Sequence, residues 1–125
     1  MAKLLIVEDD ESVRTLAARA LERAGHSIDI AADGAQGLAM ISAAGGGYDL
    51  VVSDIRMPEM DGIEMAIAAA RLFPDMKILL MTGYADQRER ASGLSALIHD
   101  VITKPFSLGD IRGAVNDALA TRVLN

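Results

Sequence analysis

Acidic, hydroxyl and ammonium side chains follow the apolar runs of this sequence, at the points where the strands of a parallel sheet would end. These residues are Glu8, Asp9, Asp10, Asp54, Thr82 and Lys104. Carboxylates that lie close together repel one another and favour their protonated forms unless a cation joins them. Oxygen ligands suit a hard ion such as Mg²⁺. With a hydroxyl and an ammonium beside the metal, the set matches the needs of a phosphoryl group, and Asp54 would be the nucleophile that forms an acyl phosphate.

The strands expected to position these side chains are short apolar runs. LLIV at 4–7, LVV at 50–52 and ILLM at 78–81 are rich in branched residues and lack polar alternation. Such runs are typical of strands buried on both faces of a parallel sheet. SIDIA at 27–31 and LIHDVI at 97–102 are weaker strand candidates.

Apolar residues at helical spacing separate the strand candidates. The helical patterns cover 13–24, 35–39, 63–70, 85–96 and 108–119. Gly25 is expected to stop the first helix, Asp86 to cap the fourth and Ser107 to cap the last. Strand–helix alternation predicts a doubly wound α/β fold with helices on both faces of a parallel sheet. In such folds the functional site lies outside the carboxyl ends of the strands.

Length and composition restrict the class of protein. The chain has 125 residues and 51% hydrophobic residues, which fits one domain with a single sizeable core. A net charge of −6 disfavours nucleic acid as a partner and is compatible with a bound cation or a basic protein partner. The absence of cysteine excludes disulfides and thiolate chemistry. No signal peptide or membrane span is evident, so we expect a soluble cytoplasmic protein.

Several sequence pieces together resemble the response-regulator receiver domains of the CheY-like type. The matching pieces are LLIVEDD (4–10), VVSDIRMPEMDG (51–62), MTGYA (81–85) and TKPF (103–106), in order over essentially the whole chain. The resemblance implies a flavodoxin-like (βα)5 fold, with a five-stranded parallel sheet in the order 2-1-3-4-5. It also implies a role in a two-component phosphorelay, with Mg²⁺ as the cofactor.

The resemblance assigns the metal and phosphoacceptor positions residue by residue. Asp54 matches the phosphoacceptor, which also contacts the metal. Asp9 matches the direct Mg²⁺ ligand, and Glu8 matches the acidic neighbour that usually acts through water. Arg56 would offer its backbone carbonyl to the metal.

The resemblance also implies a switch. Thr82 matches the switch hydroxyl, Lys104 the lysine that pairs with the phosphoryl group, and Pro105 the proline that commonly follows a cis peptide bond. Receivers usually carry an aromatic residue where this chain has Val101. We hypothesise that Tyr84 takes part in signal propagation in place of the missing ring.

The implied partners are a sensor histidine kinase or phosphotransfer protein and an unknown downstream protein. The chain would be a phosphoacceptor that assists its own phosphotransfer and dephosphorylation, rather than an enzyme. It would act as a monomer or as a phosphorylation-dependent dimer, with no nucleic-acid or membrane partner. We expect a receiver domain over 1–121, a short tail over 122–125 and no output domain, as in stand-alone regulators. A receiver domain excised from a larger regulator is the alternative.

Two other classes of protein with related sites fit the residues poorly. Aspartyl-phosphate phosphatases of the haloacid dehalogenase type need a second aspartate as general acid, at the position where this chain has Arg56. A flavodoxin-like cofactor binder would have to bring the phosphate of FMN against the carboxylates that follow the first strand.

Three further groups of residues have structural interpretations. Asp10 and Glu11 are expected to stabilise the start of the first helix. His26 and His99 are taken as surface or hydrogen-bonded residues. The methionines are taken as core or loop filler rather than as ligands.

Overall fold

A computed structural model describes residues 2–83, 98–104 and 106–120 of the chain. Five parallel strands form one sheet in the order β2-β1-β3-β4-β5, which confirms the predicted topology. The strands are β1 (Lys3–Val7), β2 (Ser27–Ala31), β3 (Leu50–Asp54), β4 (Ile78–Thr82) and β5 (Asp100–Thr103). Their carboxyl ends meet at one edge of the sheet, where Glu8, Asp54, Thr82 and Lys104 lie.

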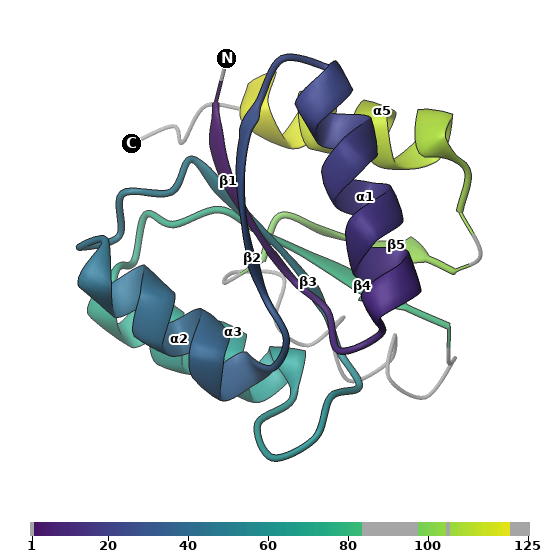
Figure 1. Ribbon diagram of the computed structural model, residues 1–125. Coiled ribbons are helices and arrows are strands. Elements are labelled where there is room, and N and C mark those ends of the chain that lie inside the picture. Colours follow the sequence, from purple (N-terminus) through teal and green to yellow (C-terminus); the bar gives the residue numbers. More distant parts are fainter. Residues whose placement is uncertain (1, 84–97, 105, 121–125) are drawn as a thin grey trace.

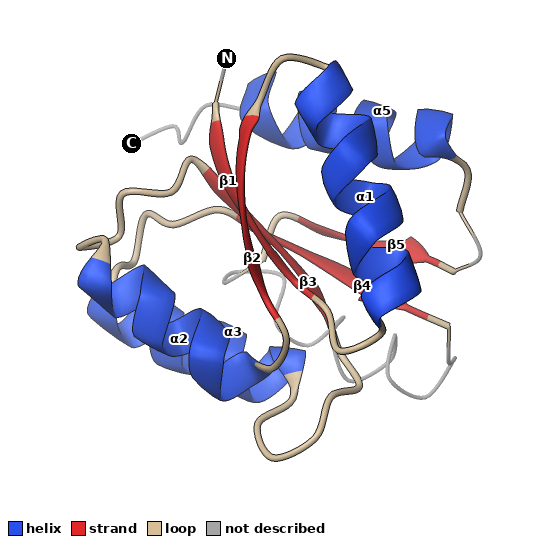
Figure 2. Cartoon of the chain, in the orientation of Figure 1, coloured by secondary structure: helices blue, strands red, loops and turns tan. Residues whose placement is uncertain are grey.

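The helices of the described part lie on both faces of the sheet. They are α1 (Glu11–Arg23), α2 (Gly34–Ala43), α3 (Gly62–Leu72) and α5 (Leu108–Ala120). Figure 1 shows α1 and α5 together on one face, and α2 and α3 together on the other. Figure 2 shows the same two helical layers around the central strands. The helix predicted over 85–96, with Asp86 as its cap, lies outside the described residues.

The central strands are buried on both faces, as their apolar runs predicted. All residues of β3 and β4 and all but the first of β1 are buried, whereas the edge strands β2 and β5 are half-exposed. The strand predicted over 97–102 began too early, because β5 covers Asp100–Thr103. Ile98 is buried in the core and the N–H of His99 donates to the carbonyl of Ile78 at 2.7 Å, so these residues pack as a connection before the strand.

Local hydrogen bonds explain where the helices begin. Asp10 is the N-cap of α1, as expected, and accepts hydrogen bonds from the backbone N–H groups of Ser12 and Val13. Asp61 and Glu64 form a capping box at the start of α3. Ser107 accepts a hydrogen bond from the N–H of Asp110 at 3.0 Å, which confirms its predicted capping role.

Apolar side chains form one core layer on each face of the sheet. Leu5 and Val7 belong to the layer under α2 and α3, whereas Leu4 and Ile6 belong to the layer under α1 and α5. Both layers together fix the strands, and thereby the positions of the residues at their ends. Met57, Met65, Met76 and Met81 are buried, which confirms the core interpretation for these methionines.

Both histidines have hydrogen-bond partners. His26 Nδ1 accepts from the N–H of Ala2 at 3.2 Å, and His99 Nε2 lies 3.1 Å from Asp117 Oδ2. These contacts agree with the structural interpretation from the sequence. None of the helices in the described ranges combines the length and the apolar character that crossing a membrane requires.

Candidate functional site

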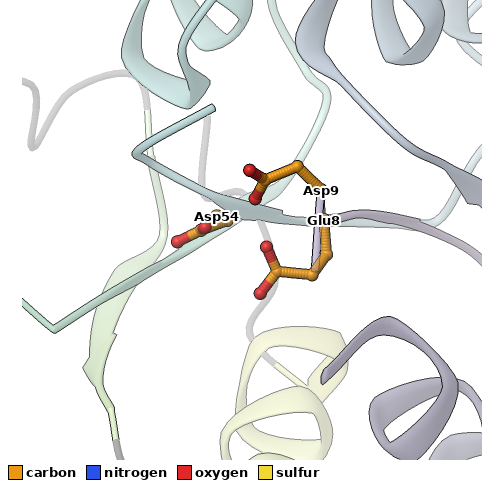
Figure 3. A group of neighbouring side chains, drawn as sticks. All are labelled: Glu8, Asp9 and Asp54. Atoms are coloured by element: carbon orange, nitrogen blue, oxygen red, sulfur yellow. The ribbon is translucent and has the colours of Figure 1, made fainter. Parts of the chain in front are cut away.

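Three carboxylates meet where β1 and β3 end. Val7 pairs with Ser53 in the parallel ladder, so the residues that follow them, Glu8 and Asp54, lie side by side. Oxygen atoms of Glu8, Asp9 and Asp54 all lie within 4.8 Å of one another. Figure 3 shows the acidic side chains gathered in one small region. Glu8 is 0% exposed and Asp54 is 7% exposed, whereas Asp9 is exposed to solvent.

Lys104 brings a positive charge to these acids from the end of β5. Its Nζ lies 2.7 Å from Glu8 Oε1 and 3.2 Å from Asp54 Oδ1. Its backbone N–H donates to the carbonyl of Thr82 at 2.7 Å, which ties the residue to the end of β4. The sequence predicted that Lys104 pairs with a phosphoryl group, but it did not predict the ion pair between Lys104 and Glu8.

Glu8 is held by contacts along its backbone and side chain. Its N–H donates to the carbonyl of Ala31 at 3.1 Å, and its carbonyl accepts from Arg14 Nη1 at 2.8 Å. Oε1 is paired with Lys104, but Oε2 is buried and has no hydrogen-bond partner among the described residues. The involvement of Arg14 was missed, because a bond to a backbone carbonyl leaves no pattern in the sequence.

Burial and mutual repulsion shift the pKa values of these groups. Burial raises the pKa of Glu8, and the neighbouring Asp54 adds to the rise more than Lys104 reduces it. The pKa of Asp9 is raised by desolvation and then by Glu8. Burial would lower the pKa of Lys104, but the carboxylates of Glu8 and Asp54 outweigh it and raise that pKa. The shifts of Glu8 and Asp9 have the direction that burial and the predicted repulsion would both produce.

The carboxylates face an open pocket of about 480 Å³. The residues that line it are Glu8, Asp9, Asp10, Asp54, Arg56, Gly83 and Lys104. Arg56 is exposed and lines the pocket, and its predicted role as a backbone ligand of the metal stays a prediction. Asp10 also reaches the pocket, but its side chain caps α1, so it serves the helix.

The predicted switch residues are only partly within the described structure. Thr82 is 1% exposed at the end of β4, and Gly83 rather than Thr82 stands among the described residues at the pocket. Val101 lies on β5 and packs, half-buried, against the core layer under α2 and α3. Tyr84 and Pro105 lie outside the described residues, so the hypotheses about them stay predictions.

Comparison with known proteins identifies the family to which the chain belongs. The sequence model of the response regulator receiver domain matches residues 4–116. The chain belongs to this family. Within it, the receiver protein CpdR of Brucella abortus (strain 2308) is 34% identical over 119 residues, which cover 95% of this chain and 98% of CpdR.

Other relatives of this receiver domain are much longer proteins. The sensor kinase CckA of Brucella abortus (strain 2308) is 35% identical over 118 residues, which cover 94% of this chain but 12% of CckA. The transcriptional regulatory protein TcrA of Mycobacterium tuberculosis is 36% identical over 109 residues, which cover 42% of TcrA. This receiver domain therefore spans less than half of each of these two relatives.

Solved receiver structures share the fold. The response regulator TrrA of Thermotoga maritima, in complex with Mg(2+)-BeF, has a TM-score of 0.85 and 31% identity, with 95% of this chain and 100% of that chain covered. A CheY-like receiver domain protein of Methanospirillum hungatei has a TM-score of 0.85 and 32% identity, with 95% and 94% covered. These neighbours agree with the flavodoxin-like architecture of the CheY-like type.

The acidic pocket of this receiver domain fits a hard divalent cation. Glu8 Oε2 is an unpartnered buried oxygen among the described residues, and the pKa values of Glu8 and Asp9 are raised by crowding and burial. A cation would relieve the repulsion, and a water molecule bound to it would satisfy the oxygen. Asp9 offers an exposed carboxylate toward the pocket, and Arg56 lies at its rim.

Proposed function

We propose that this receiver domain accepts a phosphoryl group on Asp54 from a phosphohistidine of a sensor histidine kinase or phosphotransfer protein. The contact of Lys104 Nζ with Asp54 Oδ1, at 3.2 Å within an acidic pocket, carries the proposal. An ammonium at this position can bind an oxygen of an incoming phosphoryl group while the carboxylate attacks. A role confined to structure would not require three crowded carboxylates, two of which contact one lysine.

The proposed transfer is an in-line displacement at phosphorus. A carboxylate oxygen of Asp54 forms the new O–P bond, and the P–N bond to the donor imidazole breaks. The electron pair of that bond returns to the imidazole nitrogen, which then takes up a proton. Lys104 would bind a transferred oxygen, and the hydroxyl of Thr82 would donate a hydrogen bond to another.

The proposed cofactor is Mg²⁺, held by the carboxylates of Asp9 and Asp54 and the backbone carbonyl of Arg56. Glu8 would contribute through a water molecule. When bound, Mg²⁺ supplies positive charge that neutralises the carboxylates and the phosphoryl oxygens. The acidic pocket and the unpartnered Glu8 Oε2 support the choice, as does the similarity to TrrA, whose structure is that of a complex with Mg(2+)-BeF.

The acyl phosphate would bias a two-state equilibrium of the domain and change its affinity for a downstream protein. This makes the chain a phosphoacceptor rather than an enzyme with turnover. By similarity to the receiver protein CpdR, the proposed context is a single-domain regulator, whereas the matches to CckA and TcrA cover only 12% and 42% of those longer proteins. Tyr84 is proposed to help transmit the change.

Labelling with acetyl phosphate and Mg²⁺ tests the phosphoacceptor. Intact-mass spectrometry should show the addition of one phosphoryl group to the wild type and none to Asp54→Asn. Asp75→Asn is the matched control, because Asp75 is exposed and precedes β4, whereas the pocket lies beyond the carboxyl ends of the strands. Labelling of Asp54→Asn at the wild-type rate would contradict the assignment.

A further inference from the structure

Arg14 connects the first helix to the peptide that carries two of the pocket acids. Its backbone N–H donates to the carbonyl of Asp10 at 2.9 Å, within the first turn of α1. Its side chain turns back, and Nη1 donates to the carbonyl of Glu8 at 2.8 Å. The guanidinium of Arg14 therefore links the start of α1 to the end of β1 by a hydrogen bond.

The carbonyl of Glu8 needs such a donor because of its place in the chain. The ladder between β1 and β3 ends at Val7, and Glu8 itself is 0% exposed. A backbone carbonyl without a partner in such a place costs about 1–3 kcal/mol. A guanidinium forms a charge-assisted bond, which is stronger than a bond from a neutral group.

The bond from Arg14 restrains the backbone that carries Glu8 and Asp9. The N–H of Glu8 is bound to Ala31 at 3.1 Å, so the residue is held on both sides of its Cα. The carbonyl of Glu8 lies in the same rigid peptide plane as the N–H and Cα of Asp9. Rotation of that plane would move the carboxylate of Asp9 relative to those of Glu8 and Asp54.

Repulsion among the three carboxylates favours displacement of Asp9, which a restraint on its backbone opposes. The carboxylate oxygens of Glu8, Asp9 and Asp54 lie within 4.8 Å of one another. Asp9 is the exposed member of the group, so it could relieve the repulsion by turning toward solvent. With the Glu8 carbonyl held by Arg14, relief by rotation of the peptide between Glu8 and Asp9 would cost this hydrogen bond.

We propose that Arg14 is a positioning residue that keeps the divalent-cation site formed before the cation binds. The inference rests on the proposed Mg²⁺ site and adds a residue that does not touch the cation. Partners that orient metal ligands typically contribute about 10- to 100-fold to metal affinity. We therefore expect Arg14→Gln to bind Mg²⁺ about 10-fold more weakly than the wild type.

Titration calorimetry with Mg²⁺ alone tests the inference. Arg14→Gln removes the charge, and Arg14→Lys keeps a cationic donor without the planar guanidinium. We expect Arg14→Lys to retain more affinity than Arg14→Gln. Arg19→Gln is the matched control, since Arg19 is an exposed residue of the same helix that lines a separate surface pocket. Its affinity should stay within about twofold of the wild type, as surface substitutions seldom matter more.

Each outcome has a defined consequence. Affinity of Arg14→Gln within twofold of the wild type would overturn the role of Arg14 alone. Equal weakening in Arg14→Gln and Arg19→Gln would assign the effect to net charge and would also overturn it. Absence of Mg²⁺ binding in the wild type would overturn the metal site together with this inference. If Arg14→Gln does not fold, the Mg²⁺ affinity of Arg14→Lys tests the inference instead. Wild-type Mg²⁺ affinity in Arg14→Lys would overturn the need for the guanidinium.

Discussion

Lys104 and Glu8 form an ion pair of 2.7 Å between residues that are 96 positions apart in the sequence. The pair joins the end of β5 to the end of β1, across the strands that separate them in the sheet. Glu8 is completely buried, so the ammonium is its main compensation for lost solvation. Among the described residues only one carboxylate oxygen of Glu8 has a partner, which leaves Oε2 for a cation or its bound water.

The raised pKa of Glu8 predicts how stability depends on pH without metal. Its folded-state pKa lies above the usual value of 4.5, so the folded chain retains a proton that the unfolded chain has released. This stabilising contribution is fully present below pH 4.5 and is lost as the pH rises through the raised pKa. As the pH rises from 4.5 through the raised pKa of Glu8, the free energy of unfolding of the wild type should therefore fall relative to that of Glu8→Gln.

Urea denaturation at a series of pH values, with EDTA present, measures this difference. Glu8→Gln keeps the size of the side chain and cannot titrate, so it isolates the contribution of Glu8 from other acids. Mg²⁺ should reduce the pH dependence of the wild type, because a bound cation favours the ionised carboxylate. A wild type whose stability relative to Glu8→Gln rises over this pH range would contradict the direction of the shift.

Asp9 and Asp10 are adjacent, and we predict opposite consequences when each is replaced. Asp9→Asn should abolish most Mg²⁺ affinity with little loss of stability, because Asp9 is exposed and belongs to the acidic cluster. Asp10→Ala should cost about 0.5–2 kcal/mol, since Asp10 caps α1. Calorimetric Mg²⁺ titration and urea denaturation of both variants measure the two effects. The assignment of roles would be reversed if Asp10→Ala lost metal affinity and Asp9→Asn lost stability.

The fold could be predicted from the sequence mainly where burial is complete. The runs at 4–7, 50–52 and 78–81 are apolar throughout because both faces of those strands lie under helices. The edge strand β5 has two partly buried residues between two exposed ones, so its pattern is weaker and its start was misplaced. Apolar residues that pack as a connection, such as Ile98, look the same in the sequence as residues of a strand.

The site could be predicted where parallel strands end, but its fine geometry could not. The gathering of Glu8, Asp9 and Asp54 follows from strand order alone, and the structure confirms it. The ion pair of Glu8 with Lys104 depends on side-chain length and burial, which no spacing rule encodes. The bond from Arg14 to a carbonyl also depends on how α1 leaves the sheet, a property of the folded chain.

Tyr48 provides a prediction at the opposite end of the sheet from the pocket. Its hydroxyl donates to Asp29 Oδ2 at 2.7 Å, and Lys3 Nζ lies 5.0 Å from its ring centroid. Burial, followed by the Asp29 contact, raises the pKa of Tyr48 to about 12. Tyr48→Phe should lower the free energy of unfolding by about 1 kcal/mol at neutral pH, because it removes this hydrogen bond.

The stabilising effect of the Tyr48 hydroxyl should disappear at high pH. The folded chain retains the phenolic proton above the usual pKa of 10.0, so this contribution is lost as the pH rises from 10.0 through about 12. Tyrosinate absorbance of the wild type minus that of Tyr48→Phe should give a titration midpoint near 12. A midpoint near 10.0 would show that the burial and the Asp29 contact do not hold in solution.

Gly62 lies so close to the phosphoacceptor that a larger residue should disturb it. A Cβ at this position would lie 2.1 Å from the carbonyl oxygen of Asp54 and 3.0 Å from Ile55 Cα, so the backbone would have to move. Gly62→Ala should therefore cost about 1–3 kcal/mol of stability. It should also slow phosphorylation of Asp54, because the end of β3 that carries the carboxylate would shift.

Gly113→Ala is the matched control for Gly62→Ala. Gly113 lies within α5, and an added Cβ would meet nothing within 4 Å. Alanine should stabilise the helix there by about 0.5–1 kcal/mol, since it restricts the unfolded chain more than glycine does. Urea denaturation and the rate of mass increase with acetyl phosphate compare the variants. If the two variants had equal stability and equal labelling rates, the contact between Gly62 and Asp54 would place no constraint on the phosphoacceptor. If Gly62→Ala were destabilised and slowly labelled while Gly113→Ala was not, the close approach of α3 would be what holds Asp54 in place.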